Sequence, residues 1–201
     1  MKKRPLAKST SRQQRRSDHT RARLLDAATE LFIAHGYDAL TLGEVTERAD
    51  LGTGTLYLHF RDKRALYEGI VRRVLAGLYE RWQRTDDPSA DPAERVVGMI
   101  RAMIEQLIER PALGRLCLLD GPPVETWLVG DIAKGMAFFL EGPQRELRAS
   151  LIIGVALAAG RHYLRSDHQP KARQLLETTL AFCSGALDSA QPTAARTRRV
   201  A

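Results

Sequence analysis

Residues 51–60 read L51-G-T-G-T-L-Y-L-H-F60, a stretch that holds two glycines, two threonines, two aromatic residues and a histidine. Its Gly-x-Gly pattern has two competing interpretations. Such patterns occur in loops that bind the phosphates of a nucleotide. They are also compatible with a short helix whose small outward side chains approach the phosphates and bases of DNA. The choice between them decides the fold class.

The nucleotide-loop interpretation lacks the residues that it requires. A dinucleotide-binding loop follows a strand and has a third Gly or Ala three residues after the second glycine, where this chain has Tyr57. The Gly-Lys-Ser/Thr ending of a P-loop is also missing. The preceding segment has a helical pattern that opens at T41-L-G-E44, where Thr41 and Glu44 can form a capping box. The residues therefore favour a helix.

In a helix, Leu56 and Phe60 lie four residues apart and are expected to face inward together. Gly54 and Leu58 then face outward, with Thr53 and Tyr57 beside them. Hydroxyl groups can meet phosphates or base edges in a major groove, and an apolar side chain can meet a thymine methyl. With the short capped helix before it and the tight turn A49-D-L-G52, the stretch predicts a helix-turn-helix.

The rest of the chain shows helical periodicity throughout and no convincing strand pattern. We predict an all-α fold of about nine helices, in which a long fourth helix joins a three-helix front to a larger C-terminal part. The polar segment T85-D-D-P-S-A-D-P92 is the clearest linker. The expected domains are a basic disordered arm, a helix-turn-helix domain, a helical effector-binding and dimerisation domain and a disordered tail, over residues 1–16, 17–66, 67–188 and 189–201.

Positive charge is concentrated at the N-terminus. Residues 1–23 carry nine Lys and Arg against one Asp, a net +8, whereas the whole chain carries +7 and the remainder therefore −1. A near-neutral body with a basic arm favours a polyanionic partner, nucleic acid before membrane. Whether the arm itself contacts DNA stays open.

The segments T41-L-G-E-V-T-E-R-A-D-L-G-T-G-T-L-Y-L-H-F-R-D-K-R-A-L-Y67 and L24-L-D-A-A-T-E-L-F-I-A-H-G-Y37 resemble the DNA-binding domain of the TetR family of bacterial transcriptional regulators. The resemblance covers about residues 16–75, and its T-L-Y-x-H-F-x-x-K core is highly specific. It implies a homodimeric repressor that binds a palindromic operator in double-stranded DNA and is released by a small apolar or amphipathic ligand. The alternative is a regulator of the same fold that has no small-molecule effector and is controlled by a protein partner.

The resemblance also assigns DNA-contacting residues. Thr55, Tyr57 and His59 match phosphate-contacting positions, the first two also touching bases, and Lys63 matches a phosphate-binding lysine. The full expected set is Thr41, Thr53, Gly54, Thr55, Tyr57, Leu58, His59 and Lys63. Two residues depart from the family pattern. Gly52 stands where a capping Ser is common, and Asp50 replaces a turn glycine, a position that Asp adopts only at some cost.

Large adaptable side chains follow in the C-terminal part. Met99, Met103 and Leu107 form a stripe at intervals of four. Methionine and aromatic side chains suit a cavity for apolar ligands, although each is equally at home in a core. The resemblance implies a ligand pocket here, for which the expected residues are Met99, Met103, Leu107, Cys117, Trp127, Phe138, Phe139 and His162.

The last two expected helices carry small or apolar residues at intervals of four. Ser150, Gly154 and Ala158 keep the first of them thin, so that another helix can approach closely. The resemblance implies that both helices pair with their copies in a dimer. The expected interface comprises Ser150, Gly154, Ala158, Leu176, Leu180, Cys183 and Leu187.

No catalytic grouping is evident, so we predict no enzyme activity, no cofactor and no metal site. Cys117 and Cys183 lie far apart and lack ligand spacing, although a redox role for either thiol stays open. The longest apolar run, residues 151–160, is half of what a bilayer requires. We therefore expect a cytoplasmic protein with no membrane partner.

Overall fold

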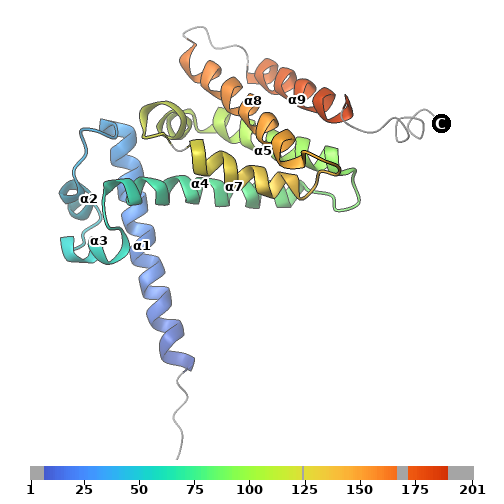
Figure 1. Ribbon diagram of the computed structural model, residues 1–201. Coiled ribbons are helices and arrows are strands. Elements are labelled where there is room, and N and C mark those ends of the chain that lie inside the picture. Colours follow the sequence, from blue (N-terminus) through green and yellow to red (C-terminus); the bar gives the residue numbers. More distant parts are fainter. Residues whose placement is uncertain (1–6, 124, 167–171, 190–201) are drawn as a thin grey trace, which may run out of the picture. The chain divides into compact units, whose positions relative to one another are not determined.

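The computed structural model describes residues 7–123, 125–166 and 172–189, which form helices joined by loops and turns (Figure 1). No strand occurs among these residues, which confirms the all-α prediction. The elements are α1 (Ala7–His35), α2 (Leu42–Arg48), α3 (Thr53–His59), α4 (Lys63–Thr85), α5 (Pro92–Glu109), α6 (Pro111–Arg115), the π-helix η1 (Leu116–Asp120), α7 (Glu125–Ala137), α8 (Arg145–Arg165) and α9 (Ala172–Ser189).

The chain divides into two compact units, the first ending at Arg73 and the second beginning at Val74. The division falls inside α4, so this helix contributes its first half to one unit and its second half to the other. The sequence predicted this boundary between residues 66 and 67, about two helical turns earlier. The later boundary has a physical reason, because Ile70 and Val71 are about 1% exposed and complete the core of the first unit.

The first unit is built around an apolar face of α1. Leu24 and Ala28 are fully buried there and Phe32 is 1% exposed, as their spacing of four predicts. The rings of Phe32 and Tyr37 stack at 5.4 Å, and the Tyr37 ring meets Tyr67 of α4 edge-on at 5.5 Å. Gly36 ends α1 with a φ of +81°, the left-handed conformation expected of a glycine at this place.

The N-terminus differs from the expected disordered arm. Residues 1–6 lie outside the described residues, but α1 begins at Ala7, so residues 7–16 are helical. Arg, Gln and Lys are good helix formers, and Gln14 donates a hydrogen bond of 2.9 Å to Asp18 one turn later. The expected tail from residue 189 lies almost wholly outside the described residues.

In the second unit α5 packs against α8 and α9, and α7 packs along α8 (Figure 1). Its core is formed by buried side chains from all four helices, among them Ile100, Ile104, Met136, Ile153 and Leu187.

Part of the expected dimer interface belongs to this core. Leu180, Cys183 and Leu187 are at most 8% exposed and pack inside the chain, while Leu176 is half-buried against the same cluster. The periodicity of α9 identified an apolar face correctly, but that face meets α5 and α8 of the same chain. Leu180, Cys183 and Leu187 therefore serve the core of their own chain and not an interface, while the assignment of Leu176 to an interface stays a prediction.

The small residues of α8 divide between two environments. A Cβ on Gly160 would stand 3.0 Å from Leu107 Cδ1, so this glycine allows close packing inside the chain. Gly154 and Ala158 are exposed, and Ser150 is half-buried. The exposed positions remain available to a second chain.

Candidate nucleic-acid interface and apolar cavity

The helix α3 has one buried side and one exposed side. Leu56 is fully buried, and Phe60, which follows the helix, is 3% exposed, as the helical interpretation predicts. Leu58 is 85% exposed and Tyr57 55% exposed. Thr53 and Gly54 are also exposed, and Thr55 and His59 are half-buried beside them. A seven-residue helix is too short to be stable alone, so the buried pair holds this outward face in place.

The helix before it has the predicted capping box. The Thr41 hydroxyl accepts a hydrogen bond from the Glu44 amide at 3.3 Å, and the Thr41 amide donates to the Glu44 carboxylate at 2.7 Å. The Thr41 hydroxyl and amide hydrogen bonds hold the pKa of Glu44 below its ordinary value. Thr41 is thus committed to the start of α2, and its expected DNA contact stays a prediction.

The turn between α2 and α3 carries the strain that the sequence predicted. Asp50 has a φ of 49°, in the left-handed region, and Gly52 caps α3 without a side-chain hydrogen bond. Arg23 of α1 supports this turn by donating to the carbonyl of Ala49 at 2.6 Å and to that of Asp50 at 3.2 Å. The sequence treated Arg23 only as part of a basic arm and missed this role, because its partner lies 26 residues away.

Lys63, at the start of α4, is a second residue with a structural role. Its ammonium donates to the carbonyls of Asp38 and Leu40 at 3.0 and 2.8 Å and lies 4.7 Å from the centre of the Tyr37 ring. An ammonium has three donors, and two are used here. The lysine therefore joins the segment after α1 to α4, and its expected contact with a phosphate stays a prediction.

The second unit contains an apolar cavity of about 470 Å³. Its walls come from α4, α5, α7 and the two residues that follow α7. The lining residues are Leu75, Leu78, Tyr79, Trp82, Met99, Met103, Asp131, Ile132, Gly135, Met136, Phe138 and Phe139. This volume is within the range of pockets that bind small molecules.

Four of the eight residues expected in a ligand pocket line this cavity: Met99, Met103, Phe138 and Phe139. Leu107 instead belongs to the core beside Gly160, Cys117 lies in η1, and His162 is exposed on α8. The side chain of Trp127 lies outside the described residues. The sequence analysis did not predict Tyr79 and Trp82 as pocket residues, because it assigned α4 the role of joining the two parts of the chain. Their spacing with Leu75 and Leu78 is nevertheless that of one helix face.

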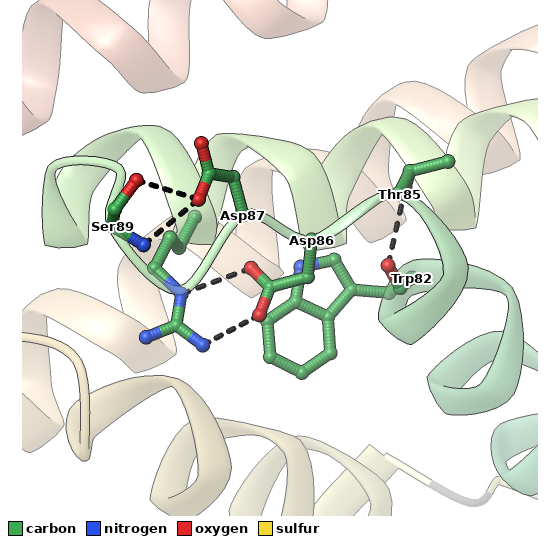
Figure 2. Close-up of polar contacts among 6 residues, drawn as sticks. Trp82, Thr85, Asp86, Asp87 and Ser89 are labelled. Carbon is green, nitrogen blue, oxygen red and sulfur yellow. Dashed lines mark hydrogen bonds and ion pairs between the residues drawn. The ribbon is translucent and has the colours of Figure 1, made fainter.

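A polar cluster supports one wall of the cavity from behind. Figure 2 shows Asp86, which accepts hydrogen bonds from the Arg95 guanidinium at 2.9 and 2.5 Å. The same guanidinium lies 4.4 Å from the Phe139 ring centre and 5.8 Å from that of Trp82. Trp82 is 4% exposed, and its Nε1 is buried with no hydrogen-bond partner in the described structure. Arg95 thus contacts the rings of both Trp82 and Phe139, and the carboxylate of Asp86 compensates its charge.

Burial raises the pKa of the Cys117 thiol to about 12 and raises that of Cys183 above its ordinary value. Both thiols therefore stay protonated near neutral pH, whereas a redox-sensing cysteine reacts as the thiolate. Among the described residues, no His, Cys, Asp and Glu side chains gather as a metal-binding group, and no helix is long and apolar enough to cross a bilayer.

Comparison with known proteins finds a family match within the first unit. Residues 24–70 match the family described as "Bacterial regulatory proteins, tetR family". The repressor KstR2 of Mycolicibacterium smegmatis is 32% identical over 92 residues, which cover 46% of this chain and 45% of KstR2. The chain therefore spans under half the length of that relative. The activator FasR of the same organism is 25% identical over 184 residues, covering 85% of this chain and 84% of FasR.

The whole fold also has a counterpart among solved structures. NalD, described as the secondary repressor of the MexAB-OprM multidrug efflux pump in Pseudomonas aeruginosa, superimposes with a TM-score of 0.65. It is 18% identical, and the match covers 85% of this chain and 98% of NalD. The likeness confirms an all-α fold with an N-terminal helix-turn-helix and a helical C-terminal domain. These relatives are named as transcriptional regulators and none as an enzyme.

Proposed function

We propose that the chain is a homodimeric transcriptional repressor of the tetR family, released from a palindromic operator by a small apolar or amphipathic ligand. The observation that carries the DNA-binding part is the outward face of α3. This face is small and uncharged, presents Tyr57 and Leu58 to solvent, and stands on a fully buried Leu56. A helix held in this way can enter a major groove without rearrangement.

The DNA part is tested by fluorescence anisotropy with DNA from upstream of the chain's own gene. We expect Tyr57→Ala to lower the affinity about tenfold, the effect of losing a hydrogen bond to a charged phosphate. Tyr79→Ala is the matched control, because Tyr79 is also 55% exposed but belongs to the second unit. Equal affinities for both variants would show that α3 is not the DNA-binding element.

The dimer part rests on exposed apolar side chains of α8 and α9. Leu147 and Leu151 are 54% and 61% exposed and share one face of α8 with Gly154 and Ala158. Phe182 of α9 is 61% exposed. Exposed apolar patches of this kind mark interfaces. We expect Leu151→Asp to produce monomers in analytical ultracentrifugation and to weaken operator binding, since two half-sites need two linked recognition helices.

The ligand part rests on the apolar cavity, because a ready-made space of this size favours a small-molecule effector over control by a protein partner alone. An effector is expected to raise the melting temperature of the protein and to lower its affinity for the operator. A dimer that ignores every cavity-binding ligand while bound to DNA would instead support the protein-partner alternative.

A further inference from the structure

We propose that the first turns of α1 form a second DNA-binding surface, a basic stripe that contacts the phosphate backbone beside the groove entered by α3. The inference rests on the DNA-binding function proposed above and adds a sequence-independent contact to it. The stripe is formed by Arg12, Arg16 and His19, with Arg15 at its edge.

These turns of α1 lie outside the core of the first unit. Leu24 is the first buried side chain in the described part of this helix, and residues 12–16 are all exposed. Figure 1 shows the start of α1 running past α2 and α3, with no other helix of this unit beside it. Short helical turns without packing partners gain little stability from the rest of a protein. The start of α1 therefore presents a surface that the first unit does not use in its own packing.

The basic residues of these turns share one face of the helix. Arg12, Arg16, His19 and Arg23 follow each other at intervals of four, three and four residues, which places them in one row. Asp18, the one acid of residues 12–23, lies off this row and accepts a hydrogen bond from the glutamine one turn before it. Arg23 donates to the backbone carbonyls of the turn that leads into α3, at 2.6 and 3.2 Å. The row thus begins beside that turn and extends about 16 Å along α1.

The arginines of the stripe have no partner within the described part of the chain. Arg21, further along α1, lies 4.7 Å from the centre of the Phe60 ring at the end of α3. Arg12, Arg15 and Arg16, by contrast, are exposed and form no ion pair or hydrogen bond with another described residue. A guanidinium carries a fixed positive charge and offers several donors to an anion. The charge of these three residues is therefore available to an anionic partner.

The residue types indicate DNA and not a membrane. Residues 12–19 read R12-Q-Q-R-R-S-D-H19 and contain no apolar side chain. A helix that lies on a bilayer needs an apolar face to bury. DNA needs only charge and hydrogen bonds, because arginines bind its closely spaced phosphates. A minor groove about 6 Å wide is too narrow for a helix of about 10–12 Å, so the stripe follows the backbone and does not read bases there.

The main test removes two charges from the stripe and measures DNA binding by fluorescence anisotropy over a range of salt concentrations. Arg12→Gln/Arg16→Gln should lower the affinity about tenfold, both for the upstream DNA and for a duplex of scrambled sequence. The slope of log affinity against log salt should flatten by about two per protomer, since each phosphate contact contributes about 0.9. The matched control is Arg84→Gln/Arg101→Gln, which removes the same charge from exposed arginines of the second unit and should leave affinity and slope unchanged.

A second variant shows whether the face matters or only the charge of the segment. Arg12→Gln/Gln14→Arg has the composition of the natural chain but moves one arginine about 200° around α1. Arginine and glutamine have similar helix propensities, so the helix content measured by circular dichroism should be retained. We expect this variant to bind both duplexes about threefold more weakly than the natural protein, as Arg12→Gln alone does. An affinity and salt slope equal to those of the natural protein would overturn the stripe.

The outcomes separate this inference from the proposed function. If Tyr57→Ala weakens operator binding but Arg12→Gln/Arg16→Gln changes neither affinity nor slope, recognition by α3 stands and the stripe fails. If the arginine variant loses affinity for both duplexes while Tyr57→Ala has no effect, the stripe stands and the assignment of α3 fails.

Two further results would also overturn the stripe. One is a loss of affinity confined to the upstream DNA, because phosphate contacts do not depend on sequence. The other comes from vesicles of phosphatidylglycerol, which test the membrane as partner. Binding to these vesicles that requires Arg12 and Arg16, with DNA binding unchanged in the double variant, would assign the stripe to a lipid surface instead.

Discussion

Leu56 and Leu58 are two residues apart in α3, and replacing each by alanine separates folding from DNA recognition. Leu56 is fully buried and Leu58 is 85% exposed. The same chemical change is therefore expected to have opposite consequences. Leu56→Ala should destabilise the first unit, whereas Leu58→Ala should leave stability unchanged and alter the choice of DNA sequence.

The magnitudes follow from the burial of the two side chains. Leu-to-Ala changes in a packed core cost about 3 kcal/mol or more, because a cavity remains. In a domain of this size that corresponds to a fall of roughly 12–24 °C in melting temperature. Folding buries only a small part of Leu58, so its loss costs about 0.3 kcal/mol. In a DNA complex, losing its contact with a thymine methyl should cost about 1 kcal/mol, or roughly fivefold in affinity.

Thermal unfolding followed by circular dichroism measures the first effect. Fluorescence anisotropy measures the second, with the operator and with a version in which thymines of each half-site are replaced by uracil, which lacks the methyl group. The fivefold loss for Leu58→Ala should disappear on the uracil duplex. The reasoning is refuted if Leu58→Ala unfolds as easily as Leu56→Ala, or if its affinity loss is the same on both duplexes.

Three further predictions concern single residues elsewhere. Lys63→Ala should weaken binding to all DNA sequences and flatten the salt dependence by about one ion per protomer, and an unchanged slope would leave Lys63 only its contacts with the carbonyls of the first unit. Gly36→Ala should lower the free energy of unfolding by about 1 kcal/mol, because the φ of Gly36 is +81°. Gly77→Ala should raise it by about 0.5 kcal/mol, because Gly77 lies inside helix α4 with open space at its Cβ. A denaturant titration that finds the same sign for both variants would contradict this. Burial raises the pKa of the Cys117 thiol to about 12, so this thiol should react with iodoacetamide at pH 8 about a thousandfold more slowly than an ordinary thiol. The contribution of the protonated thiol to the free energy of unfolding should be lost as pH rises from 9 towards 12, since only the unfolded chain is then deprotonated. Fast labelling of the native protein would contradict this burial.

The local elements could be predicted because their determinants lie close together in the sequence. The capping box of Thr41 and Glu44, the end of α1 at Gly36 and the two faces of α3 each depend on residues within one or two helical turns. The same holds for Asp91, which caps α5 by accepting a hydrogen bond from the Ala93 amide at 2.8 Å. Local spacing was sufficient for these features.

Long-range partners could not be predicted in this way. Periodicity shows that α9 has an apolar face, but not that Cys183 and Leu187 meet the same chain rather than a second one. Likewise, the stripe of Met99, Met103 and Leu107 is uniform in sequence, yet the two methionines line the cavity and the leucine packs beside Gly160. Burying an apolar side chain against any apolar surface lowers the free energy of the folded chain, so the residue type does not specify its partner.

By itself, therefore, the sequence determined the helix-turn-helix, the exposed face of α3 and the all-helical class, since these depend on contacts between near neighbours. Only the tertiary structure decided which apolar faces are used internally, which walls enclose the cavity, and that Arg23 and Lys63 bind backbone carbonyls. Those features join residues more than twenty positions apart, and their geometry exists only once the chain has folded.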